Sequence, residues 1–121
     1  MAKRILIADD NKIVRRTLRT LLTNQLDVEV CAEAEDGRKA IEAAVALRPD
    51  LVILDVRMPE LNGIEVATIL KRTLPELKTI LFTMYSDHVG KDLASAAGVN
   101  VILPKQVGVS RFIETVGSLL Q

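Results

Sequence analysis

Several features that would place a protein in a specialised class are missing from this sequence. Its 121 residues include a single cysteine, Cys31, so no disulfide framework can form. No apolar run approaches the ~18 residues that a membrane-spanning helix needs. The 16 acidic and 16 basic side chains cancel, so no net charge would steer the chain toward a nucleic acid or a membrane surface. MAKR leads directly into ILIA without the pattern of a signal peptide, and we expect a cytoplasmic protein.

The overall composition is that of one ordinary globular domain. Apolar residues make up 49% and charged residues 26% of the chain, a balance typical of compact proteins. No repeat, low-complexity segment or linker interrupts it. A chain of 121 residues can bury a sufficient core, so we expect a single domain over residues 1–121.

Short apolar runs alternate with helical patterns along the whole chain. The runs predict strands over 4–8, 28–32, 51–55, 79–83 and 99–103. Apolar residues at helical spacing predict a first helix with a stripe of Val14, Leu18, Leu21 and Leu22, and further helices over 37–47, 62–73, 87–97 and 108–120. Strands this apolar are buried on both faces, so we predict an α/β fold with a doubly wound, five-stranded parallel sheet flanked by five helices. The polar alternation of the second strand indicates a sheet edge.

Polar side chains follow or end the predicted strands. Asp9 and Asp10 follow the first strand, Asp55 ends the third, Thr83 ends the fourth, and Lys105 lies two residues past the fifth. Ligands of parallel α/β sheets bind at the carboxyl ends of the strands, so these side chains should converge. Three neighbouring carboxylates repel one another and need protonation or a cation. Mg²⁺, which takes one or two carboxylates and keeps several waters, fits best.

A site of this composition can accept a phosphoryl group. A carboxylate can attack phosphorus to give an aspartyl phosphate, and the reaction depends mainly on positioning and charge neutralisation. In this interpretation Asp55 is the acceptor, and Asp9 and Asp10 hold the metal. Lys105 offsets charge on the phosphoryl oxygens, and Thr83 donates a hydrogen bond to one of them.

Each of these residues also has a purely structural interpretation. Asp9 and Asp10 precede a helix and could cap it, while Asp55 could cap the turn after its strand. Thr83 taken alone is a hydroxyl at a sheet end, and Lys105 taken alone is a surface lysine. The joint arrangement favours a functional site, because four successive strand ends each deliver a suitable group.

The motifs ILIADDNKIVRRTL, LVILDVRMPELNGIE, TILFTMYSD and ILPK resemble those of response regulator receiver domains over the whole chain. The resemblance implies a flavodoxin-like strand order of 2-1-3-4-5. It places the phosphoacceptor at Asp55, the acidic pair at Asp9 and Asp10, the switch hydroxyl at Thr83 and the lysine at Lys105. It also implies that the metal ligands are Asp10, Asp55 and the backbone carbonyl of Arg57, with Asp9 acting through water.

The same resemblance implies a role in two-component signal transduction. The phosphoryl donor would be a phosphohistidine on a sensor histidine kinase or a histidine phosphotransfer protein. The domain would be a phosphoacceptor that catalyses its own phosphorylation and dephosphorylation rather than an enzyme acting on other substrates. The TMYSD stretch is similar to receivers that precede a DNA-binding helix-turn-helix domain. The chain is then either a stand-alone receiver or part of a longer regulator.

Three positions depart from the family pattern. Ile102 stands where receivers usually have Tyr or Phe, which puts the usual threonine–aromatic switch in doubt; Tyr85 could substitute. Pro104 precedes Lys105, whereas receivers usually have the proline after the lysine. Met84 follows Thr83 where many receivers have Ala or Ser, and its bulk could narrow the path for small phosphodonors.

Competing functions are weaker but distinct. A haloacid-dehalogenase-type phosphatase would need a second Asp two residues after Asp55, where this sequence has Arg57. A flavodoxin-type flavin binder would need a hydroxyl- and glycine-rich loop where DDNK stands. A receiver fold that binds partners independently of phosphorylation remains the main alternative.

Two surfaces could contact partners. Ile13 lies off the core stripe of the first helix and could contact a kinase. The basic residues of that helix are expected to form a solvated face rather than a nucleic-acid site, because no aromatics lie between them: Lys12, Arg15, Arg16 and Arg19. The apolar last helix suggests a homodimer through the fourth helix, fifth strand and fifth helix.

Overall fold

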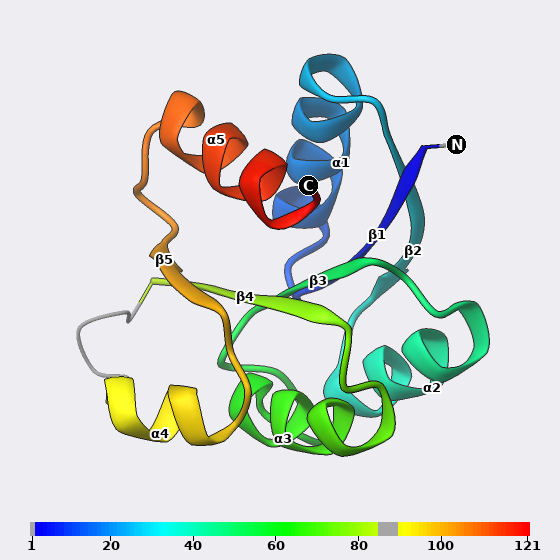
Figure 1. Ribbon diagram of the computed structural model, residues 1–121, viewed down its shortest axis with the longest axis vertical. Helices are drawn as coiled ribbons and strands as arrows, with labels where there is room; N and C mark the ends of the chain where they lie inside the picture. The colour runs from blue at the N-terminus through cyan, green and yellow to red at the C-terminus, as the bar shows by residue number, and fades with distance from the viewer. Residues whose placement is uncertain (1, 85–89) are drawn as a thin grey trace.

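The structure, a computed structural model, describes residues 2–84 and 90–121 and alternates strands with helices (Figure 1). The strands are β1 (Lys3–Ala8), β2 (Val28–Ala34), β3 (Leu51–Leu54), β4 (Lys78–Thr83) and β5 (Val101–Pro104). The helices are α1 (Lys12–Gln25), α2 (Gly37–Leu47), α3 (Gly63–Thr73), α4 (Lys91–Ala96) and α5 (Val109–Leu119).

The five strands form one parallel sheet in the order β2-β1-β3-β4-β5. This order confirms the predicted doubly wound fold, including the edge position of the second strand. The chain leaves β1 toward one edge, forms β2, and then crosses back to β3 on the other side of β1. The reversal places the ends of β1 and β3 side by side, which is where such sheets bind ligands.

Helices cover both faces of the sheet, α1 and α5 on one face and α2, α3 and α4 on the other (Figure 1). Alternate residues of β1 point to opposite faces: Ile5 and Ile7 join the core under α1 and α5, while Leu6 joins the core under α2 to α4. Phe82 and Phe112 pack with ring centroids 5.2 Å apart and link β4 to α5. None of the described helices is both long and apolar enough to cross a bilayer.

Several predicted boundaries were wrong by a few residues. The second strand continues to Ala34, because β2 pairs with β1 along its whole length. The fifth strand begins at Val101 rather than at residue 99, since Val99 N–H donates to Ala94 O in the turn after α4. The fourth helix begins at Lys91 after an extended Gly90. The predicted helical residues 87–89 lie outside the described part of the chain.

Glu60, in the loop between β3 and α3, has a left-handed backbone conformation with φ of 72°. This conformation costs an L-residue roughly 1–2 kcal/mol, whereas glycine adopts it without a Cβ clash. Glycine also gives the unfolded chain more freedom, which offsets part of the gain. We expect Glu60→Gly to raise the free energy of unfolding by about 0.5–1 kcal/mol in urea denaturation.

Glu76 provides the matched control. It is an exposed residue of the turn between α3 and β4 and is not among the described non-glycine residues with positive φ. Glu76→Gly should lower stability by about 0.5–1 kcal/mol through the unfolded state. Equal changes in the two variants would show that the backbone at Glu60 is not strained.

Candidate functional site

The carboxyl ends of the central strands bring the predicted site residues to one edge of the sheet. Asp9 directly follows β1, Asp55 directly follows β3, and Thr83 is the last residue of β4. Lys105 directly follows β5, and its backbone N–H donates to Thr83 O at 2.9 Å. That hydrogen bond holds Lys105, the first residue after β5, against the end of β4.

The three acids form a compact cluster with Lys105 inside it. Carboxylate oxygens of Asp9, Asp10 and Asp55 all lie within 4.8 Å of one another. Lys105 Nζ donates to Asp9 Oδ2 at 2.6 Å and lies 3.3 Å from Asp55 Oδ2. One ammonium therefore bridges two acids. Its single positive charge balances only part of the negative charge of the three carboxylates.

Burial makes this charge imbalance costly. Asp9 and Asp55 are buried, whereas Asp10 is exposed. Burial raises the pKa of Asp55, the charge of Asp9 raises it further, and Lys105 only partly opposes them. Burial alone would lower the pKa of Lys105, but its hydrogen bonds and charge interactions with Asp9 and Asp55 raise it above the ordinary value. The lysine therefore stays charged, and Asp55 remains short of positive partners.

Neither acidic segment caps a helix. The N-cap of α1 is Asn11, whose side chain accepts hydrogen bonds from the N–H groups of Ile13 and Val14 at 2.9 and 3.2 Å. The N-cap of α3 is Asn62, which forms a capping box with Glu65. The two asparagines supply the caps that a structural interpretation assigned to the acids. The carboxylates of Asp9, Asp10 and Asp55 are thus not used as caps of these helices, although Asp9 Oδ1 accepts a hydrogen bond from Asn11 N–H at 2.8 Å.

Gly63, the first residue of α3, lies against the end of β3. Its N–H donates to Val56 O at 2.8 Å. A Cβ at this position would lie only 2.2 Å from the backbone oxygen of Asp55, which no side chain can do without a backbone shift. Because glycine has no side chain, α3 can begin in direct contact with the backbone of Asp55.

The remaining predicted residues lie around this cluster. Thr83 is fully buried at the end of β4, and Arg57 is exposed in the loop after Asp55. Ile102 is half-buried and packs against the core under α2 to α4, so an aliphatic side chain stands in the place of the usual aromatic ring. Tyr85, considered as its substitute, lies outside the described residues. The roles of Thr83 and the Arg57 carbonyl stay predictions.

One group of residues beside the cluster was not predicted from the sequence. Arg15, assigned to a solvated basic face, has a side chain only 13% exposed and pairs with Glu33 of β2. Arg19 pairs with the same carboxylate. The prediction was wrong for these two arginines, because Glu33 is distant in the sequence and only the β1–β2 pairing brings it to α1. Exposed Lys12 and Arg16 agree with the solvated interpretation.

The donor set suits a hard divalent cation. All three acids offer oxygen, the donor that Mg²⁺ prefers, and they come from two rigid strand ends. A bound dication would also relieve the burial of charge at Asp55. The fold and this cluster together define a doubly wound α/β domain with an acidic cluster at the carboxyl edge of its sheet.

Comparison with known proteins identifies the family. The response regulator receiver domain family matches residues 5–117. The response regulator protein VraR of Staphylococcus epidermidis is 32% identical over 116 residues, which cover 96% of this chain and 56% of that protein. The chain belongs to the response regulator receiver domain family and is a receiver domain of the two-component type. It spans about half the length of the relatives that it matches.

Solved structures show the same architecture. The receiver domain of AraT from Geobacillus stearothermophilus is 32% identical with a TM-score of 0.88, covering 99% of this chain and 94% of that one. A LuxR-family response regulator from Aurantimonas is 27% identical with a TM-score of 0.89, covering 99% and 86%. Similarity to VraR and to the LuxR-family regulator agrees with the predicted relation to the helix-turn-helix output branch.

We expect Asp55→Asn to raise the free energy of unfolding at pH 7 in the presence of a chelator, because it removes a buried charge next to Asp9. Since the pKa of Asp55 is higher in the folded state, the folded state binds its proton more tightly. The stabilisation should therefore be absent below pH ~3.9, the unfolded value. It should grow as the pH rises through the folded pKa. Urea denaturation of both proteins across this pH range measures it.

Asp27→Asn is the control, because Asp27 is an exposed carboxylate in the loop between α1 and β2. Its stability difference from the wild type should be small at every pH. A stability gain of Asp55→Asn over the wild type that is no larger at pH 7 than at pH 3.5 would contradict the account of Asp55 as a desolvated, under-compensated carboxylate.

Proposed function

We propose that this receiver domain accepts a phosphoryl group on Asp55 and thereby switches its binding to a partner. The observation that supports this most directly is the position of Asp55: buried, not used as a helix cap, and in an acid cluster served by one lysine. A carboxylate with no structural task in such surroundings fits a nucleophile better than a scaffold residue. The natural donor is a phosphohistidine of a sensor histidine kinase or of a histidine phosphotransfer protein.

In the transfer, an oxygen of the Asp55 carboxylate attacks phosphorus, and the P–N bond of the phosphohistidine breaks with its electron pair going to the imidazole. Lys105 lies next to Asp55 and offsets negative charge on the phosphoryl oxygens. The hydroxyl of Thr83 donates a hydrogen bond to one of those oxygens, which couples the modification to the end of β4. Hydrolysis of the aspartyl phosphate by water restores Asp55.

Asp10 and Asp55 would hold the Mg²⁺, the Arg57 carbonyl would supply a further oxygen, and Asp9 would act through water. When bound, the metal neutralises charge on the transferring phosphoryl group. The fit rests on the clustered carboxylate oxygens of Asp9, Asp10 and Asp55.

Phosphorylation is tested by intact-mass measurement. Incubation with phosphoramidate and Mg²⁺ should add one phosphoryl group to the wild type and none to Asp55→Asn, because the amide is not a nucleophile of comparable strength. Asp27→Asn should be modified as the wild type is. A wild type that stays unmodified both with phosphoramidate and with its cognate kinase would sink the proposal.

The position of Met84 leads to a second prediction about the same site. It follows Thr83, its side chain is 55% exposed, and its sulfur lies 3.7 Å from Nε2 of Gln106, which follows Lys105. The side chains of Met84 and Gln106 thus contact each other next to Thr83 and Lys105, the two residues proposed to contact the phosphoryl group. We expect Met84→Ala to speed modification by phosphoramidate about two- to tenfold, a barrier change of up to ~1.4 kcal/mol.

The control for Met84 is Leu93→Ala. Leu93 is a similarly exposed apolar residue on α4, 59% accessible, and its removal should leave the rate unchanged. Equal rates for wild type and Met84→Ala, or equal acceleration in both variants, would contradict a restricted approach at Met84.

Two surfaces support partner binding to different degrees. Ile13 is 76% exposed at the start of α1 and borders an apolar groove of about 280 Å³ between α1 and α5 that reaches Lys105. We propose this groove as the docking place of the kinase or phosphotransfer protein. The predicted homodimer has weaker support, because Phe112 and Val116 of α5 are buried within the domain and only Val109 is a large exposed apolar residue of that helix. It stays a prediction.

A further inference from the structure

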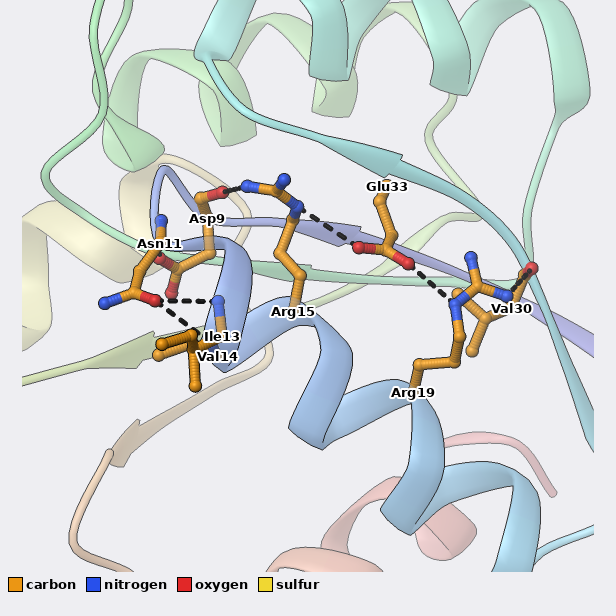
Figure 2. Close-up of polar contacts among 8 residues, drawn as sticks. All are labelled: Asp9, Asn11, Ile13, Val14, Arg15, Arg19, Val30 and Glu33. Carbon is orange, nitrogen blue, oxygen red and sulfur yellow. Dashed lines mark hydrogen bonds and ion pairs between the residues drawn. The ribbon is translucent and has the colours of Figure 1, made fainter.

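Asp9 is held from four directions. Its backbone N–H donates to Ala34 O at 3.0 Å, Asn11 N–H donates to its Oδ1 at 2.8 Å, and Lys105 Nζ donates to its Oδ2. The fourth contact comes from Arg15, whose Nη1 donates to the backbone carbonyl of Asp9 at 2.6 Å (Figure 2). Lys105 and the acids belong to the phosphorylation site; Arg15 has no role there so far.

Helix geometry explains how Arg15 reaches this carbonyl. Side chains of an α-helix point back toward its N-terminus. Arg15 lies one turn into α1, so its guanidinium extends over the segment that connects β1 to the helix. There it meets the Asp9 carbonyl, which a side chain pointing forward could not reach.

The other side of the guanidinium is fixed by Glu33 of β2. Arg15 Nε lies 3.2 Å from Glu33 Oε1, and Arg19 Nε lies 2.6 Å from Glu33 Oε2 (Figure 2). Burial raises the pKa of Glu33, but hydrogen bonds and charges of Arg19 and Arg15 outweigh it and bring the pKa below its ordinary value. Glu33 is therefore ionised at neutral pH and anchors Arg15 to the edge strand of the sheet.

We propose that Arg15 is a positioning residue for the metal site, an inference that rests on the proposed function. The peptide bond between Asp9 and Asp10 is planar, so a donor that holds the Asp9 carbonyl also fixes the amide of Asp10. The plane fixes the positions of both Cα atoms and so restricts where the two carboxylates can lie. Arg15 thus keeps the exposed Asp10 carboxylate beside those of Asp9 and Asp55, where the cation would bind.

The sign of the effect on Mg²⁺ affinity separates this role from two simpler ones. A cation near a dication site repels the metal, so if Arg15 acted only through its charge, its removal would tighten Mg²⁺ binding. If Arg15 only stabilised the fold, its removal would lower the free energy of unfolding and leave the affinity of the folded protein unchanged. A positioning role predicts weaker binding, because the two acids lose their fixed orientation.

The test is Mg²⁺ binding by calorimetry and by amide NMR shifts of Asp9 to Asn11, together with urea denaturation. Arg15→Gln should weaken Mg²⁺ binding about tenfold or more, as outer-sphere substitutions commonly do. Arg16→Gln removes the same charge from an exposed position of the same helix and should leave the affinity at the wild-type value. Arg15→Lys keeps the charge without the planar fork and should also bind more weakly than wild type.

Glu33→Gln provides a second route if Arg15→Gln does not fold. It leaves Arg15 in place but removes its anchor, and should weaken Mg²⁺ binding in the same direction by a smaller factor. Wild-type affinity or tighter binding in Arg15→Gln, or in Arg15→Lys and Glu33→Gln together, would overturn the inference while phosphorylation of Asp55 stands. A wild type that binds no Mg²⁺ and is not phosphorylated would overturn the proposed function and this inference with it.

Discussion

One lysine between buried acids sets the electrostatics of this domain. Lys105 contacts Asp9 and Asp55, and Asp10 adds a third carboxylate to the same cluster. The cluster therefore carries more negative charge than its lysine can balance, in surroundings where water compensates little. That deficit gives the site its chemical character, because it favours a divalent cation and, under the proposed function, keeps a carboxylate oxygen available to attack phosphorus. An ion pair with balanced opposite charges at this position would have only a structural role.

The rest of the edge is built so that the three acids need not cap the helices beside them. Asn11 and Asn62 cap the two helices that begin beside the site, and Gly63 allows α3 to start in contact with the backbone of Asp55. Neutral side chains thus cap the N-termini of these two helices, while the carboxylates of Asp9, Asp10 and Asp55 remain in the cluster. The same separation extends to Arg15 behind the cluster, which contacts the backbone carbonyl of Asp9 while Glu33 balances its charge.

Departures from the family pattern lie around the phosphoryl position rather than in it. Ile102 is accommodated as an aliphatic residue of the core under α2 to α4, and Met84 extends into solvent toward Gln106. The acids, Thr83 and Lys105 are all at their strand ends. Under the proposed function, these departures change residues that would transmit the modification and leave the proposed phosphoryl-binding groups unchanged.

The sequence alone determined the α/β class, the strand sequence and the convergence of Asp9, Asp55, Thr83 and Lys105, because buried parallel strands have a simple apolar signature and their ends must share one edge. Element ends were less certain, as at Val101 and Lys91, because hydrogen bonds to other elements decide where pairing stops. Only the tertiary structure showed that Asn11 and Asn62, rather than Asp9, Asp10 or Asp55, cap the two helices beside the site. It alone joined Arg15 to Glu33, since that contact depends on strand pairing between residues far apart in the chain.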